Sequence, residues 1–216
     1  MASCTRCGAF FAGVDHRSHH LEISAEDFSY LLQRARQSIP FAVQLAQFNQ
    51  LDSHDTPRFI HLLKGDKALL KVAVTMLMSY IGVPCLYYGD EIALDGAHDP
   101  DNRRPMPWDE ALWDSDIKAH YQKLIKLRKA LKVLQEGDIL SLYAKGDVYV
   151  FARFLAGQRV IVAINRGAAA EVRLDLRLLD IDNATIHDLL AEGPYAEANQ
   201  GRLNLKLAAK TALMLG

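Results

Sequence analysis

The spacing of apolar residues changes at Gly137. Before it, apolar residues recur every three or four positions in several long stretches, which is the period of an amphipathic helix. After it, they recur mostly at every second position, in short runs separated by Gly, Asp and Asn, which is typical of strands and their turns. The pattern therefore predicts an α/β segment before Gly137 and an antiparallel β-sandwich over residues 137–216.

Helices are predicted over residues 24–37, 66–80 and 115–134, because each stretch presents one apolar stripe. Ser24 stands where a capping residue of the first helix is expected. The apolar segments 48–51 and 83–88 flank the middle helix, as two neighbouring parallel strands would. After Gly137, strands are predicted at residues 139–143, 148–155, 159–165, 171–174, 185–189, 202–207 and 211–215.

The amino-acid composition indicates a soluble globular protein. Half of the residues are hydrophobic and 24% are charged, as in ordinary soluble globular domains. A net charge of −1 gives no indication of nucleic-acid binding, and no apolar run approaches the ~20 residues of a membrane span. Three cysteines, an odd number, favour a reducing, cytoplasmic location over a disulfide framework.

Polar side chains cluster where each predicted parallel strand ends. Side chains in such loops carry the chemistry of many β/α folds, since the strand fixes the backbone beneath them. Neighbouring strands lie about 4.8 Å apart, so carboxylates at their ends could approach the ~5–5.5 Å separation of a retaining glycosidase pair. They could equally be helix caps or structural pairs. The acids concerned are Asp52, Asp55, Asp90 and Glu91.

Three stretches resemble motifs of the α-amylase family of glycoside hydrolases, in the family's order. They read QFNQLDSHDTPRF, GVPCLYYGDE and DPDNRRPMPW, the last at residues 99–108. The subgroup they resemble is that of the cytoplasmic maltodextrin glucosidases, with cyclomaltodextrinases and neopullulanases next. The resemblance implies the last part of a TIM (β/α)8 barrel over 24–136, a β-sandwich domain over 137–216, and a loop or barrel remnant over 1–23.

The resemblance also implies roles for individual residues. Asp55 matches the family's third acidic residue, which binds sugar hydroxyls at the cleaved bond and stabilises the oxocarbenium-like transition state. His54 matches a histidine that binds the same sugar. Asp99 and Arg103 match a charged pair that shapes the same subsite. The acids at 90 and 91 then become structural groups beneath the site, with no catalytic role.

The same resemblance implies that two groups lie elsewhere. The nucleophilic Asp and the acid/base Glu of the retaining mechanism belong to the fourth and fifth barrel strands, and residues 1–47 contain neither motif. A β/α barrel takes roughly 250 residues, far more than precede the sandwich here. We therefore predict the C-terminal part of a retaining α-glucosidase that acts on α-1,4 bonds of maltodextrins, inactive alone. Whether it trims chain ends or opens cyclic dextrins is left open.

Partners and cofactors follow from this prediction. Two strands cannot close a barrel, so open strand edges and uncovered apolar helix faces are expected, with self-association or packing against a missing N-terminal part of the barrel. No cofactor or metal is expected. One alternative is a non-catalytic module that binds carbohydrate or completes another polypeptide's barrel. Another is a small zinc module built from Cys4, Cys7, His16, His19 and His20.

Overall fold

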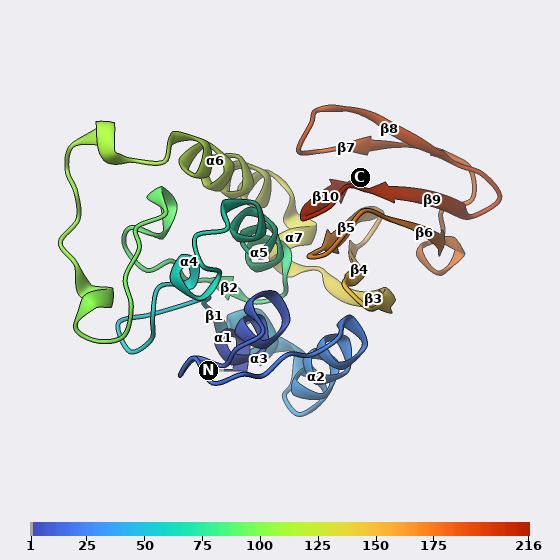
Figure 1. Cartoon of the computed structure of the whole chain (residues 1–216). Helices are drawn as coiled ribbons and strands as arrows, with labels where there is room; N and C mark the ends of the chain where they lie inside the picture. Colours follow the sequence, from blue (N-terminus) through green and yellow to red (C-terminus); the bar gives the residue numbers. More distant parts are fainter. Residues whose placement is uncertain (1) are drawn as a thin grey trace.

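A computed structural model describes residues 2–216, with side chains from Thr5 onward. Helices make up most of the first part, and strands make up the second (Figure 1). No helix among the described residues is long and apolar enough to cross a membrane. The main helices are α1 (Ala2–Cys7), α2 (Ala25–Gln37), α3 (Phe41–Ala46), α4 (Phe59–Leu62), α5 (Lys67–Ser79), α6 (Ser115–Ala130) and α7 (Lys132–Glu136).

The expected pair of parallel strands is present but short. β1 (Phe48–Asn49) lies beside β2 (Val83–Pro84) in parallel, with α5 in the connection between them. The second strand was predicted to reach residue 88, and this prediction is wrong in length. The last described hydrogen bond between the two segments is donated by the Cys85 N–H to the Asn49 carbonyl at 2.7 Å, and beyond it Tyr87 and Tyr88 pack on the guanidinium of Arg58.

The second part contains a six-stranded antiparallel sheet and a two-stranded sheet. The strand order in the larger sheet is β3-β4-β5-β10-β7-β8, and the smaller sheet pairs β6 with β9. The predicted class, an α/β segment followed by antiparallel sheets, is therefore confirmed. The strands are β3 (Asp138–Lys145), β4 (Val148–Leu155), β5 (Gln158–Asn165), β6 (Ala170–Asp175), β7 (Ala184–Asp188), β8 (Gly193–Ala198), β9 (Arg202–Leu207) and β10 (Thr211–Leu215).

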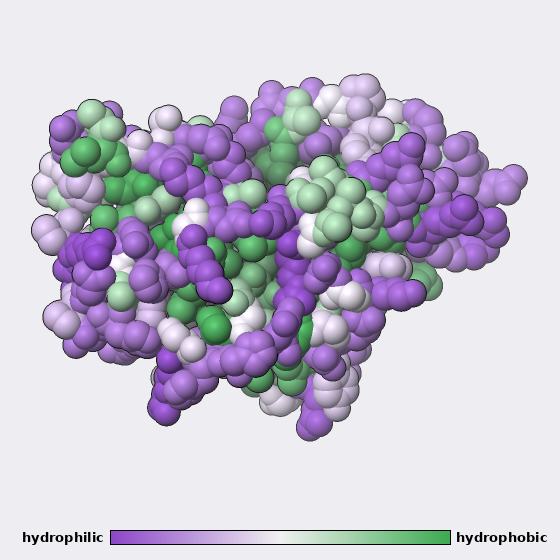
Figure 2. Space-filling view, viewed as in Figure 1, coloured by the Kyte–Doolittle hydropathy of each residue, from purple (hydrophilic) through white to green (hydrophobic). Residues whose placement is uncertain are grey.

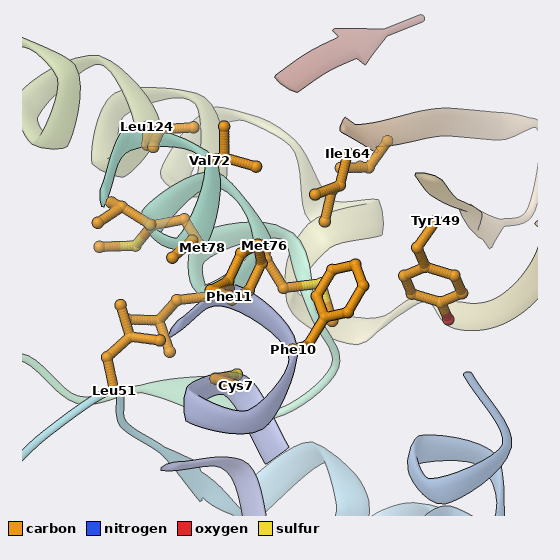
Figure 3. Packing of buried hydrophobic residues seen from close by; sticks show 14 of the residues in the cluster. Cys7, Phe10, Phe11, Leu51, Val72, Met76, Met78, Leu124, Tyr149 and Ile164 are labelled. Atoms are coloured by element: carbon orange, nitrogen blue, oxygen red, sulfur yellow. The ribbon is translucent and has the colours of Figure 1, made fainter. Parts of the chain in front are cut away.

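The six-stranded sheet is the middle layer of this arrangement, because both of its faces are apolar. Along β4, Val148, Val150 and Ala152 point into a core shared with the two-stranded sheet. The alternate residues Tyr149 and Phe151 point into a larger core shared with the helices. The sandwich domain thus supplies one wall of the core of the helical part (Figure 3).

The N-terminal segment adds to the same core. In the segment 1–23, which was predicted to be a loop or a barrel remnant, α1 continues into a π-helical turn, η1 (Gly8–Ala12). Phe10 and Phe11 of this turn are buried, and the Phe10 ring stacks on Phe28 of α2 at 4.5 Å between centroids. Burial of such a ring contributes roughly 1.5–3 kcal/mol, so packing fixes a segment whose sequence pattern is weak.

Two further differences from the predicted elements have local causes. The helix expected over 115–134 ends at Ala130, because Leu131 is extended and lets Val133 and Leu134 of α7 enter the core. β8 was missed because its Gly-Pro start reads as a turn. Proline is tolerated there, since β8 forms the outer edge of the sheet.

Candidate functional site

The site begins where β1 ends. The Asn49 side chain donates to the carbonyl of Ile81 at 2.7 Å and so ties β1 to the segment that precedes β2. The chain then enters the polar loop at residues 52–58, which leads into α4. Asp52 Oδ2 accepts the backbone N–H of Phe59, the first residue of that helix. The loop is therefore anchored at both ends, and its middle residues project outward.

The four side chains predicted to bind sugar form two exposed pairs, a histidine beside an aspartate and an arginine beside an aspartate. His54 Nε2 lies 3.3 Å from Asp55 Oδ1, and these side chains are 63% and 73% exposed. Arg103 Nε lies 2.7 Å from Asp99 Oδ1, with 49% and 59% exposure. No described hydrogen bond joins one pair directly to the other. All four groups are open to solvent, and each can exchange its partner for a ligand hydroxyl.

Asn102 connects the backbones that carry these pairs. It lies in the 3-10 turn η3 (Asp101–Arg103), next to Arg103, and it is fully buried. Its Nδ2 donates to the carbonyls of His54 and Thr56, both at 2.8 Å, with a longer contact of 3.4 Å to Ser53. One side chain thus holds the loop of the first pair against the turn of the second.

Arg58 lies directly beneath this connection and is 1% exposed. Its Nε donates to the Asn102 carbonyl at 2.9 Å, and its Nη1 donates to the Tyr88 carbonyl and lies 3.2 Å from Asp90 Oδ1. The rings of Tyr87 and Tyr88 cover the guanidinium at 4.0 and 4.5 Å. A planar group with several donors suits such a crossing of three chain segments.

Two buried carboxyl groups complete this lower layer. Burial raises the pKa of Asp90 well above its ordinary value, and the nearby charge of Asp52 raises it further. Burial also raises the pKa of Asp52. The Arg58 guanidinium opposes both shifts but is the weaker influence. The pair therefore favours holding one proton, and its acids are occupied by the Phe59 amide and by Arg58, which is a structural arrangement.

The connecting residues, Arg58 and Asn102, were not among the predicted site residues. Arg58 lies near the end of the first motif and Asn102 lies inside the third, so their positions within motifs were the only available signal. An asparagine among charged residues reads as a solvated turn residue. Its burial depends on a loop almost fifty positions earlier, which spacing alone does not reveal.

Trp108 is the last residue of the third motif and lies in an irregular loop after η3. Its ring is 81% exposed, while Arg104 in the same loop pairs bidentately with Asp101 at 2.8 Å on both nitrogens. The Tyr88 hydroxyl donates to the Arg104 carbonyl at 2.7 Å. These contacts hold the start of the loop beside the site and leave the tryptophan ring free to contact a ligand.

The residues of the alternative zinc site have other partners. Cys7 is buried, His16 Nδ1 lies 2.8 Å from Thr5 Oγ1, and His19 Nδ1 lies 3.4 Å from Asp15. The Cys4 side chain lies outside the described residues. Within the described part of the chain, no group of three metal-binding side chains is close enough to hold an ion.

Comparison with known families places both parts of the chain. A model of the alpha-amylase catalytic domain matches residues 11–115, and a model of the alpha-amylase C-terminal domain matches residues 137–215. The first match contains all three motifs described above. The second coincides with the antiparallel sheets.

Proteins with similar sequences include a neopullulanase and a cyclomaltodextrinase. Neopullulanase 2 of Thermoactinomyces vulgaris is 37% identical over 196 residues, covering 90% of this chain and 33% of that protein. A cyclomaltodextrinase of a Bacillus species is 44% identical over 126 residues, covering 58% of this chain and 23% of its own length. The chain thus spans about a third or less of these two relatives.

Solved structures agree with the sequence relatives. The native debranching enzyme of Nostoc punctiforme superposes with a TM-score of 0.85 at 32% identity, over 99% of this chain and 46% of that one. The structural similarity and the sequence similarity therefore indicate the same family. Because consecutive alpha-amylase domain models match most of its length, the chain belongs to the α-amylase family and comprises part of the catalytic domain followed by the C-terminal domain.

Proposed function

We propose that this chain is the C-terminal part of a retaining glycoside hydrolase that cleaves α-1,4 bonds of maltodextrins. Asp55 binds hydroxyls of the sugar at the cleaved bond and stabilises its transition state, and His54 binds the same ring. Asp99 and Arg103 form the opposite side of this subsite. The observation that carries the proposal is the Asn102 side chain, which holds the loop of His54 and Asp55 against the turn between Asp99 and Arg103.

The chemistry of the four groups supports a sugar ligand. Carboxylates accept hydrogen bonds from hydroxyls, guanidinium donates them, and imidazole can do either. Two such pairs, each with a carboxylate acceptor and a nitrogen donor, can meet the alternating donors and acceptors of a pyranose. The family's nucleophile and acid/base are supplied by another stretch of polypeptide, so this chain contributes binding and transition-state stabilisation.

An uncovered apolar surface supports a partner that completes the barrel. α3 has no buried residue, and Phe41 and Val43 on it are exposed. Phe48 of β1 is 67% exposed, and Val83 of β2 is also exposed. Hydrophobic residues are visible between hydrophilic ones over the face seen in Figure 2. We infer that this surface packs against the remaining β/α units, or against a second copy of the chain when they are absent.

A cytoplasmic location is part of the same proposal. Cys85 is a free thiol, and it is exposed just after the end of β2. An exposed thiol persists in a reducing compartment, whereas an oxidising one would modify or cross-link it. The location is tested by fractionating cells that express the chain and probing each fraction with an antibody.

The proposal is tested by binding and by complementation. Maltotriose titrated into the chain is expected to perturb the NMR signals of residues 53–56 and 99–104, and Asp55→Asn is expected to abolish the effect. Asp175→Asn is the matched control, because Asp175 is also an exposed carboxylate beside a basic side chain, that of Arg177, but it lies in the sandwich domain. Unchanged binding by Asp55→Asn would refute the subsite.

Complementation tests the division of the catalytic groups. The chain alone is expected to leave maltotriose intact. Hydrolysis is expected when it is co-expressed with the part of neopullulanase 2 that precedes the matched region. Turnover by the chain alone would show that a nucleophile and an acid are present here, contrary to the proposal.

A further inference from the structure

We propose that Asn102 and Arg58 are positioning residues, which together lock the loop at 53–56 to the turn at 98–103. In this way they set the spacing between the two halves of the glucose subsite. The inference rests on the proposed function for the identity of the ligand. The lock itself rests only on contacts between described residues.

The first part of the lock is the Asn102 amide. Both of its hydrogens are used on carbonyls at 2.8 Å, which belong to His54 and Thr56. These carbonyls flank Asp55, so fixing them fixes the direction in which the Asp55 side chain leaves the loop. Thr56 adds a local restraint, since its Oγ1 accepts the Ser53 N–H at 3.0 Å. The loop is therefore held through its backbone, and its side chains stay exposed.

The second part of the lock is Arg58. It follows the loop at 53–56 in the sequence and binds the segment that contains the turn at 98–103. Its side chain donates to the Asn102 carbonyl at 2.9 Å, and its backbone N–H donates to the Gly96 carbonyl at 2.9 Å. Gly96 is needed for this approach, because a Cβ there would lie 2.7 Å from the Asp101 carbonyl oxygen. Asn102 and Arg58 thus bind each other's segments reciprocally, and neither loop can shift without breaking buried hydrogen bonds.

The turn that Asn102 anchors is itself closed. The backbone N–H of Arg103 donates to the Pro100 carbonyl at 3.0 Å, and that of Asp101 donates to the His98 carbonyl at 2.9 Å. The Asp99–Arg103 ion pair spans the turn from outside. Movement of Asn102 therefore carries the ion pair with it, which makes the lock a determinant of subsite width.

The experiment compares Asn102→Ala with Asn165→Ala by hydrogen exchange of the purified chain. Asn165 is a matched control, because it is also fully buried and donates to two backbone carbonyls, of Ala168 and Ala208, but in the sandwich domain. Asn102→Ala is expected to accelerate exchange in peptides covering 53–58 and 96–104 by about tenfold, the equivalent of losing about 1.4 kcal/mol of local stability. Asn165→Ala is expected to leave those peptides unchanged.

Further variants separate a positioning role from general destabilisation. Asn102→Ser keeps one donor and is expected to restore slow exchange partly. Arg58→Lys keeps the charge but cannot bind three segments at once, and is expected to loosen the same peptides. Equal exchange of both loops in Asn102→Ala and Asn165→Ala would overturn the inference. So would acceleration spread evenly over the chain in Asn102→Ala and in Arg58→Lys.

Maltotriose titration links the lock to the subsite. The dissociation constant is expected to rise about tenfold in Asn102→Ala, relative to the wild-type chain and to Asn165→Ala. Unchanged affinity with loosened loops would overturn the positioning role. If the wild-type chain binds no maltotriose, the proposed function fails, and the exchange data still decide whether the lock exists.

Discussion

Two polar layers lie one above the other at the ends of β1 and β2, and they differ in what each charge touches. In the lower layer, Arg58 and Asn102 are buried and bind backbone carbonyls of distant segments. In the upper layer, His54 pairs only with Asp55, and both side chains are exposed. Exposed pairs contribute about 0–1 kcal/mol, whereas breaking a buried one costs several. The lower layer therefore carries stability, and the upper layer is free to serve a ligand.

The largest effect is expected when the lower layer loses its arginine. Arg58→Met leaves the Asn102 and Tyr88 carbonyls without donors and the Asp90 carboxyl without its cation. We expect a loss of about 3–5 kcal/mol in the free energy of unfolding, measured by urea denaturation. Arg103→Met, in the upper layer, is the control and is expected to lose less than about 1 kcal/mol. Similar losses for both variants would show that the layers do not differ.

The next effect is a pH dependence that belongs to the lower layer alone. The pKa of Asp90 is raised by burial and by Asp52, so the folded state keeps a proton at pH values where the same group in the unfolded chain has lost it. This contribution to stability is full below the ordinary pKa of aspartate and is lost as pH rises through the raised pKa. Asp90→Asn removes this loss, so we expect its stability relative to wild type to increase as pH rises above the ordinary pKa of aspartate.

The prediction is tested by whether the stability difference between Asp90→Asn and wild type rises or falls with pH. Asp90→Asn also loses the contact with Arg58, which shifts its stability at every pH but leaves the slope unaffected. Urea denaturation at several pH values gives the slope directly. Asp116→Asn, which changes an exposed carboxylate, is the control and is expected to run parallel to wild type. A stability difference between Asp90→Asn and wild type that falls with pH would contradict the prediction.

Whether the residues of a layer could be predicted depends on how far apart in the sequence its contacting residues lie. The residues of the upper layer were predicted through the resemblance to family motifs, each of which is one continuous stretch of sequence, and their role as a sugar subsite stays a prediction. The lower layer was missed, because Arg58 acts through Tyr88 and Asn102, which are 30 and 44 positions away. Periodicity describes one element at a time and contains no information on such cross-links.

The rest of the fold shows the same difference between local features, which could be predicted, and contacts between distant segments, which could not. Ser24 does cap α2, accepting the Asp27 N–H at 3.2 Å, as its position predicted. Strand β4 was also predictable, because it is a continuous, mostly apolar run between two turns. Arg153 was not readable as a core residue. It is fully buried at the junction and donates to the carbonyls of Ser79, Leu134 and Gly137, which no local pattern indicates.

A smaller effect is expected from the aromatic cover of the lower layer. Tyr87→Leu removes the ring that lies 4.0 Å from the Arg58 guanidinium and is expected to cost about 1–2 kcal/mol. Tyr30→Leu is the matched control, because Arg34 lies 5.8 Å from that exposed ring. We expect the control to change the free energy of unfolding by less than about 0.5 kcal/mol. If Tyr87→Leu costs no more, the guanidinium is held by its hydrogen bonds alone.

The smallest effect on stability is expected in the upper layer, where the effect on binding should be largest. Asp55→Asn keeps the shape of the side chain and removes only its charge and its attraction to His54. We expect the free energy of unfolding to change by less than about 0.5 kcal/mol, because the pair is exposed. Maltotriose binding is expected to disappear, because the neutral amide accepts hydroxyl hydrogen bonds more weakly than a carboxylate. A variant that lost stability but retained binding would assign Asp55 to the scaffold and reverse the order of the two layers.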